Sequence, residues 1–246
     1  MILHYIYDGS FDGLLTSIYE AYYRRENPDD IVPEDSIEAN FLIENIFIPT
    51  DREKSKKVYE AIEKKISEET LRRVFYIYLS ELPMHGITVL KYLRLGFKIG
   101  PQVDLNLSND TIRMVDNIYH KVAKEKHRML GLIRFKELEN GILYSSIEPD
   151  YNIVGLVAPH FASRMANENW AIHDVKRGIA ALYNREEWII KDIEFNDTLI
   201  VKEEEEEYQE LWKTYFKSAA IQNRINPKLQ KRNMPMRYWK YLVEKT

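Results

Sequence analysis

The sequence of 246 residues contains no cysteine, and this absence removes several kinds of chemistry at once. Without a thiol the chain cannot form disulfides or use a thiolate nucleophile. It also cannot hold an iron–sulfur cluster or a cysteine-ligated zinc ion. Any radical or redox chemistry connected with this chain must therefore belong to a partner protein. We expect the chain to carry no cofactor and no metal of its own.

Long apolar runs and standard catalytic motifs are also lacking. No apolar stretch approaches the roughly 18 residues that a membrane span requires. The first residues, MILHYIYDG, lack the basic-then-apolar layout of a signal peptide. The sequence contains no Gly-rich phosphate loop, no G-x-S-x-G elbow and no H-E-x-x-H motif. The lack of a membrane span and of a signal-peptide pattern leads us to expect a cytoplasmic protein that makes no membrane contact.

Charge is distributed very unevenly along the chain, although the net charge is only −4. Residues 208–246 contain nine Lys or Arg and two acids, which gives this basic C-terminal segment a net charge of +7. Residues 1–207 contain 26 cations and 37 acids, a net charge of −11. In the basic segment cations alternate with aromatic rings, a pattern typical of surfaces that bind phosphates and stack on bases.

We therefore predict that nucleic-acid contacts come from this segment. Arg and Lys supply phosphate contacts, Asn supplies amide donors, and each exposed ring can add about 1–3 kcal/mol by stacking on a base. Two alternatives stay open, since the last rings could dock the segment onto the core and a basic patch could bind an acidic protein. We expect residues 224–237 to make the contacts and the next two rings to anchor them. The predicted residues are Arg224, Asn226, Lys228, Lys231, Arg232, Arg237, Tyr238 and Trp239.

Apolar periodicity predicts an α+β fold that is rich in helices and forms a single domain over residues 1–246. Apolar residues recur every three or four positions over 51–129, which indicates a helical subregion inserted into the fold. Further helices are expected near residues 12–25 and 152–166, from residue 203 onward, and in the short stretch RYWKYLVE.

Alternating patterns predict the strands. We expect strands at residues 2–7 and 43–48, a hairpin around the Asn140-Gly141 pair, and two or three antiparallel strands after residue 169. Residues 26–35 hold two prolines and several acids, which predicts a loop. Helices and antiparallel hairpins occur in blocks, so we expect a small antiparallel sheet rather than a doubly wound parallel one.

One cluster of residues offers a site for acid–base chemistry. His160 and Arg164 are four residues apart and share a face of their predicted helix. On the following strand His173 and Asp174 point to opposite faces, so those two cannot act as a pair. His160 with a carboxylate could serve as general acid and base, while the alternative is that these residues satisfy buried carbonyls. The catalytic candidates are His160, Arg164, Asp174, Arg134 and Arg177.

A second cluster is the pair of carboxylates Glu148 and Asp150. Two residues apart on a strand, they would share a face and could bind magnesium or act as acid and base. Pro149 between them indicates that the strand is ending, which favours a solvated pair of charges instead.

Five separated blocks of the sequence carry a family resemblance. The blocks YDGSFDGLLTSIYEAY, HRMLGLIRFKEL, IEPDYNIVGLVAPHFASRM, WAIHDVKRGIAALY and NPKLQKRNMPMRYWKYLVE, in this order, resemble the bacterial "probable DNA metabolism protein" family, a domain of unknown function. The resemblance implies a stand-alone form of a domain that is elsewhere joined to a uracil-DNA glycosylase-like domain. It also implies a radical-SAM companion implicated in DNA modification or repair, and it offers no agreed catalytic residues.

Three functions are consistent with these observations. The first is a DNA-binding accessory protein in DNA metabolism or repair that works with a separate enzyme of radical-SAM or glycosylase type. The second is an enzyme that acts on DNA or nucleotides, which requires its His, Arg and Asp groups to converge in one concave pocket. The third is a protein–protein interaction module that binds no DNA.

Overall fold

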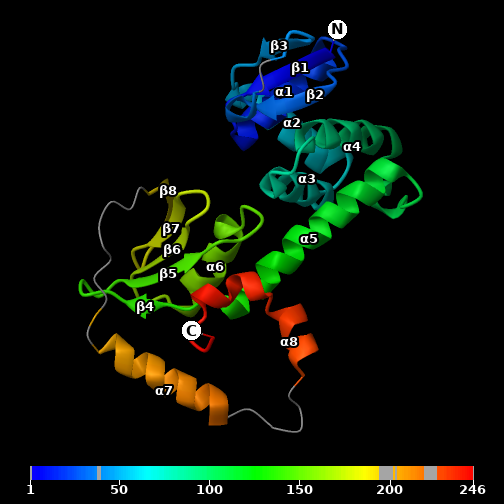
Figure 1. Cartoon of the computed structure of the whole chain (residues 1–246). Coiled ribbons are helices and arrows are strands. Elements are labelled where there is room, and N and C mark those ends of the chain that lie inside the picture. Colours follow the sequence, from blue (N-terminus) through cyan, green and yellow to red (C-terminus); the bar gives the residue numbers. More distant parts are fainter. Residues whose placement is uncertain (1, 38–39, 194–201, 203, 219–225, 246) are drawn as a thin grey trace. The chain divides into compact units, whose positions relative to one another are not determined.

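The computed structural model describes residues 2–37, 40–193, 202, 204–218 and 226–245 (Figure 1). Its contacts divide the chain into two compact units, Met1–Ala123 and Lys124–Thr246. The single domain expected from the sequence stays a prediction, because compactness does not test whether each unit folds alone. Within the described residues, no helix is both long enough and apolar enough to cross a membrane.

A parallel three-stranded sheet lies in the first unit. The central strand β1 (Ile2–Tyr7) pairs with β2 (Asp30–Pro33) on one side and β3 (Ile43–Phe47) on the other, both in parallel. The strands β1 and β3 were predicted, but β2 lies where the sequence indicated a loop. Because β2 is an edge strand, its terminal proline costs no bond inside the sheet. The parallel pairing itself was not anticipated.

Helices follow the strands of this sheet and confirm the predicted helical subregion. The helix α1 (Phe11–Tyr23) follows β1, and α2 (Arg52–Lys65), α3 (Glu68–Ser80), α4 (His85–Ile99) and α5 (Asp110–Leu132) follow β3. Single-turn 3-10 segments are η1 (Glu34–Ser36) and η2 (Val103–Leu105). The side chains of Ser10, Asp51 and Ser67 accept backbone N–H bonds at the starts of α1, α2 and α3. Such caps satisfy donors that a helix end leaves open.

The second unit holds a five-stranded sheet in the order β4 (Lys136–Glu137), β5 (Leu143–Ile147), β6 (Trp170–Asp174), β7 (Ile179–Tyr183) and β8 (Trp188–Asp192). Neighbouring strands of this sheet are antiparallel, except that β5 and β6 are parallel. The chain therefore crosses from β5 to β6 through α6 (Val154–Arg164). The predicted hairpin is confirmed between β4 and β5. Gly141 has a φ of +77° there, the left-handed conformation that favours glycine. The α+β class is likewise confirmed.

Side chains cover both faces of this sheet. On one face the ring of Phe161 from α6 packs against Trp170, with centroids 6.5 Å apart. On the other face Tyr144 and Ala171 form a small buried cluster with Leu138. The hydroxyl of Tyr144 lies 2.8 Å from Nδ1 of His173, which is also buried. Burial lowers the pKa of His173, which favours the neutral ring.

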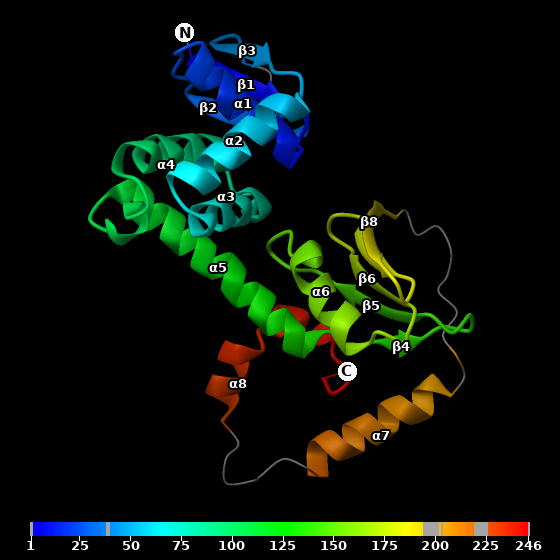
Figure 2. The same ribbon diagram turned by 180° about the vertical axis from the view of Figure 1, so that it is seen from behind.

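The C-terminal segment contains α7 (Glu205–Ser218), α8 (Pro227–Asn233) and η4 (Met236–Tyr241). The helix α7 and the final short helix were both predicted. The final helix is the 3-10 segment η4 in the structure. The helix α8 is not among the helices predicted from the sequence. Asn226 caps α8, since its Oδ1 accepts the N–H of Leu229 at 3.0 Å. Figure 2, the reverse view, also shows α8 beside the end of α5.

Candidate nucleic-acid interface

A buried carboxylate fixes the C-terminal segment in place. Glu125, near the end of α5, is 3% exposed and accepts the backbone N–H groups of Asp150 and Tyr151 at 2.9 Å each. The hydroxyl of Tyr238 donates a further hydrogen bond to Oε1 of Glu125. One carboxylate therefore connects α5, the loop after β5 and η4.

Arg237 strengthens this connection. Its Nη2 lies 2.6 Å from Oδ2 of Asp150 and 3.4 Å from Oε1 of Glu125. The same atom donates to the hydroxyl of Tyr238 at 2.7 Å, and the guanidinium lies 4.6 Å from the centroid of that ring. Arg237 is thus partly neutralised by two acids, although it keeps an exposed side.

The two rings that follow dock the segment rather than face solvent. Tyr238 is 2% exposed, so it cannot stack on a base, and we leave it out of the proposed contact surface. Trp239 donates its indole N–H to the carbonyl of Met234 at 3.0 Å, and Nζ of Lys245 lies 4.7 Å from its ring centroid. Both Tyr238 and Trp239 therefore pack against the rest of the unit, as the docking alternative predicted.

Two more acids hold the segment. Glu244 pairs with Arg134 at 2.7 Å and accepts the indole N–H of Trp212 at 3.0 Å. Burial acts to raise the pKa of Glu244, but the bonds from Arg134 and Trp212 outweigh it and hold the pKa below its ordinary value. Glu148 pairs with Lys240 and accepts the hydroxyl of Tyr241 at 2.7 Å.

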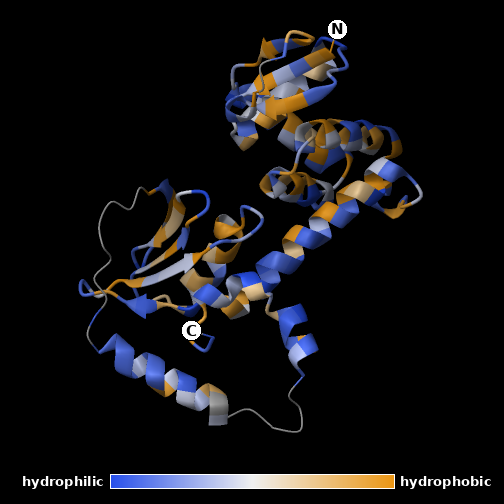
Figure 3. Cartoon of the chain, viewed as in Figure 1, coloured by the Kyte–Doolittle hydropathy of each residue, from blue (hydrophilic) through white to orange (hydrophobic). Residues whose placement is uncertain are grey.

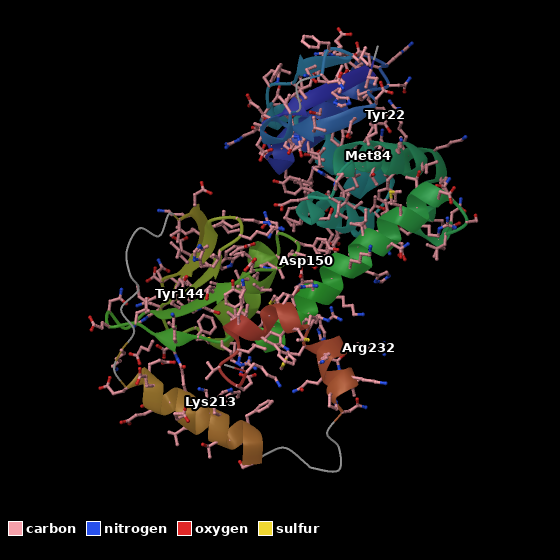
Figure 4. All side chains as sticks on the ribbon, viewed as in Figure 1. Tyr22, Met84, Tyr144, Asp150, Lys213 and Arg232 are labelled. Carbon is pink, nitrogen blue, oxygen red and sulfur yellow. The ribbon has the colours of Figure 1, made fainter. Side chains whose placement is uncertain are left out.

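The helix α8 presents cations of a different kind. Lys228, Lys231 and Arg232 fall on one helical face and are exposed, and among the residues that the structure describes no carboxylate pairs with them. Figure 3 shows α8 as mostly hydrophilic, and Figure 4 labels Arg232 on it. Arg224, predicted to join them, lies outside the described residues. Asn226 is the exposed cap of α8.

The end of α5 extends this surface. Arg128 donates from Nη2 to the carbonyl of Arg232 at 2.8 Å, which places the two helices side by side. Lys124, one turn earlier, is exposed and has no ion-pair partner in the described part of the chain. We call this set the cationic face: Lys124, Arg128, Lys228, Lys231 and Arg232.

Beside η4 lies a hollow of about 530 Å³. Its walls are Glu148, Pro149 and Asp150 after β5, Lys176 in the turn before β7, and Met236, Arg237 and Lys240 of η4. Behind it Arg177 donates to the carbonyl of Pro149 at 3.2 Å and to that of Asp150 at 2.8 Å. The hollow therefore combines cations, carboxylates and apolar surface.

The catalytic candidates do not converge. His160 and Arg164 are exposed on α6, whereas Asp174 is fully buried and pairs with Arg177 at 2.7 Å. Burial raises the pKa of Asp174, and Arg177 offsets only part of that effect. Arg134 is held by Glu244. The convergent pocket that an enzyme built on these groups requires is not formed by them.

The carboxylate pair is also separated. Glu148 faces Lys240 while Asp150 faces Arg237, so each is neutralised by its own cation. In the described part of the chain, no group of three or more metal-ligating side chains is placed to hold an ion.

Sequence reasoning missed Glu125 and Lys176. Glu125 stands in the run KEKHR and looks like one more solvated charge, so no local signal marks it as buried. Lys176 lies in a turn among charged neighbours. For α8 a signal exists, because an Asn at the cap followed by Pro at the first helical position is a helix start.

Comparison with known proteins gives a family and no activity. A family described as a domain of unknown function, DUF4130, matches residues 83–244, which is more than half of the chain. No curated protein matches it. The matched range includes α4 to η4, and hence the cationic face, the hollow and the Glu125 anchor. The resemblance found in the sequence is confirmed at this level, and the chain belongs to the DUF4130 family.

Proposed function

We propose that this protein is a DNA-binding accessory protein that works with a separate enzyme. The observation that carries the proposal is the cationic face, where five basic side chains gather with no carboxylate partner in the described part of the chain. Other basic residues of the same unit, such as Arg134 and Lys240, are paired with acids.

The chemistry of these cations fits phosphates. Lys and Arg on a helix face bind the backbone of DNA without reading its sequence, and they release counterions when they do so. Because the whole chain carries a net charge of −4, its overall charge does not attract it to DNA. The attraction to DNA therefore has to come from a local surface.

The helix α7 supports the second half of the proposal, a protein partner. Its inward side is occupied, because Trp212 binds Glu244 and Oε2 of Glu205 accepts the N–H of Glu137 at 3.1 Å. Next to that side, Tyr208 is exposed by 64%, Leu211 by 66% and Tyr215 by 62%. These three residues form an apolar stripe at helical spacing.

The acids beside this stripe indicate what covers it. Glu204 just before α7, and Glu207 and Glu210 on it, are exposed, and of these only Glu210 has an ion pair in the described part of the chain, with Lys213. Negative charge excludes DNA from this helix and disfavours a second α7. An apolar groove rimmed by Lys or Arg on a partner protein fits both the stripe and its acids. The family resemblance suggests a radical-SAM or glycosylase-type enzyme as the owner of that groove.

The rival functions have less support. An enzyme built on His160, Arg164 and Asp174 lacks a common pocket for them, because the first two are exposed on α6 and Asp174 is buried. An interaction module without DNA binding leaves the cationic face without a role.

DNA binding is tested by fluorescence anisotropy with a short labelled duplex at low salt. The variant carries K228E, K231E and R232E, and the matched control carries R52E, K56E and K65E on the exposed side of α2, with the same change of charge. We expect the first triple variant to lose at least tenfold in affinity and the control to bind almost as the wild type. Equal losses in both would reduce the effect to net charge and contradict the cationic face.

Partner docking is tested by photo-crosslinking in cells. A photoreactive residue replaces Leu211 or Tyr215, and a control replaces Tyr23, which is 76% exposed in the first unit. We expect both α7 positions to crosslink one protein, at an apolar groove bordered by basic residues, and the crosslink to disappear with E207K and E210K. Crosslinks to a second copy of the chain, or equal crosslinking from Tyr23, would contradict this docking role.

A further inference from the structure

We propose that the hollow beside η4 binds one unpaired nucleotide of the strand held on the cationic face. This inference rests on the proposed DNA binding and adds to it a site for a defined chemical unit. The hollow of about 530 Å³ has the size of a small-ligand site. Its lining offers places for both the phosphate and the base of a nucleotide.

Three cations provide for the phosphate. Lys176 is exposed and pairs with no carboxylate among the described residues. Arg237 and Lys240 each have one acid, Asp150 and Glu148, as partner at the hollow. Arg237 also lies 3.4 Å from the buried Glu125, so Lys176 is the cation of this lining that has no carboxylate partner in the described residues. Nη1 and Nε of Arg237 donate to no acceptor in the described residues, so they are open to phosphate oxygens.

Apolar surface and hydrogen-bond acceptors provide for the base. Met236 is 57% exposed at the edge of the hollow, and Pro149 forms part of the wall. Each offers apolar surface against which a base can lie. Glu148 and Asp150 bind their cations through Oε2 and Oδ2. Their other oxygens are unused in the described residues and can accept an exocyclic amino group, as Glu and Asp do from cytosine N4.

The hollow is held in shape before any ligand arrives. Arg177 binds the carbonyls of Pro149 and Asp150 from behind, and Glu125 accepts the N–H of Asp150. Preformed donors lose less entropy on binding than mobile ones do. A surface built only to attract DNA in general needs no such fixed wall.

The chain leads directly from the cationic face to the hollow. The helix α8 ends at Asn233 and η4 begins at Met236, whose side chain lines the hollow. A strand bound along α8 therefore has the hollow within reach. A base that is paired and stacked in a duplex cannot enter a hollow, so only an unpaired base can reach the apolar wall and the free carboxylate oxygens together.

The test compares a fully paired duplex with the same duplex carrying one unpaired cytosine. Wild type, K176Q and M236A are titrated by anisotropy, with R185Q as the control, because Arg185 is exposed in the turn after β7, whereas Lys176 lies in the turn before it. We expect the wild type to bind the bulged duplex about 3- to 10-fold more tightly, the effect of a single good contact. K176Q and M236A should remove most of that preference and leave binding of the paired duplex unchanged.

A second readout follows the methyl signal of Met236 in carbon-13-labelled protein, assigned with M236A. A shift with the bulged duplex and none with the paired duplex supports the site within a strand. A shift with free deoxycytidine monophosphate, without a preference for the bulge, keeps the nucleotide site but assigns it to free nucleotides. Duplex binding without any preference and without a Met236 shift overturns the inference and leaves DNA binding standing, whereas no affinity for either duplex overturns both.

Discussion

The hydroxyl of Tyr238 donates a hydrogen bond to the buried carboxylate of Glu125, although 113 residues separate the two in sequence. This bond fixes the last turn of the chain to the end of α5. The cationic face depends on it, because α8 precedes η4 directly and Arg128 follows Glu125 by one turn on α5. Folding of the C-terminal segment and the proposed contact with DNA are therefore linked.

Removing the Tyr238 hydroxyl should weaken the fold. We expect Y238F to lower the free energy of unfolding by about 1–2 kcal/mol, since a buried carboxylate loses a donor while the ring still fills its place. Urea denaturation measures this value, and Y215F serves as control because Tyr215 is 62% exposed. Equal stability of the two variants would mean that the bond to Glu125 contributes nothing to folding.

Acid should remove the contribution of Glu244. The bonds from Arg134 and Trp212 hold its pKa below the ordinary 4.5, even though burial acts in the opposite direction. A depressed carboxyl pKa stabilises the fold above the unfolded value and loses that effect as the pH falls through the folded value. We expect E244Q to be less stable than the wild type at neutral pH.

The difference between the wild type and E244Q should shrink as the pH falls below 4.5. Urea midpoints measured across this range give the result, with Glu60 as a comparison, because it forms an exposed i, i+4 pair with Lys64. E60Q should show a much smaller difference throughout, as exposed pairs contribute little. A gap that stays constant with pH would show that Glu244 acts by packing alone.

Substitution of alanine for Gly86 and for Gly131 should change the stability of the fold in opposite directions. A Cβ at Gly86 would lie 2.2 Å from the carbonyl oxygen of Ile31, so α4 could no longer pack on β2. We expect G86A to cost at least about 1–3 kcal/mol of stability, as overpacking does. Gly131 lies in α5, and no atom from outside its own stretch of helix comes within 4 Å of the added carbon, so G131A should gain up to about 1 kcal/mol from helix propensity. Thermal melts distinguish the two, and equal shifts would contradict the packing at Gly86.

Neighbouring residues of α7 should separate folding from docking. W212A removes the bond to Glu244 and the contact with Arg134, whose guanidinium lies 5.5 Å from the ring centroid. We expect a loss of about 1–2 kcal/mol. L211A should change stability by less than about 0.5 kcal/mol, since Leu211 is 66% exposed. A large loss with L211A would place its side chain in the core and remove it from the proposed partner surface.

Local patterns in the sequence predicted most of the strands of the second unit. The Asn-Gly pair marked the hairpin of β4 and β5, and alternation marked β6, β7 and β8, because these signals involve neighbouring residues. The parallel pairing of β1 with β2 could not be foretold in this way. It joins segments more than twenty residues apart, and Asp30–Pro33 carries a proline and an acid that indicate a loop.

The role of the C-terminal rings was also beyond local reasoning. Tyr238 and Trp239 have the same spacing whether they stack on bases or pack on the core, and only the distant Glu125 and Met234 decide between the two. The charge pattern identified the basic C-terminal segment. Only the tertiary structure shows which of its cations pair with acids. Arg237 and Lys240 pair with acids, while Lys228, Lys231 and Arg232 are exposed and pair with no carboxylate in the described residues.

The salt dependence of DNA binding tests the central claim most directly. The logarithm of the binding constant should fall linearly with the logarithm of salt concentration, with a slope of about −0.9 for each phosphate contact. We predict that the combined K228E, K231E and R232E variant reduces this slope by about 2–3 relative to the wild type, while the R52E, K56E and K65E control keeps it. A wild-type affinity that does not change with salt, or a slope that the α8 variant leaves intact, would contradict the assignment of DNA binding to the cationic face.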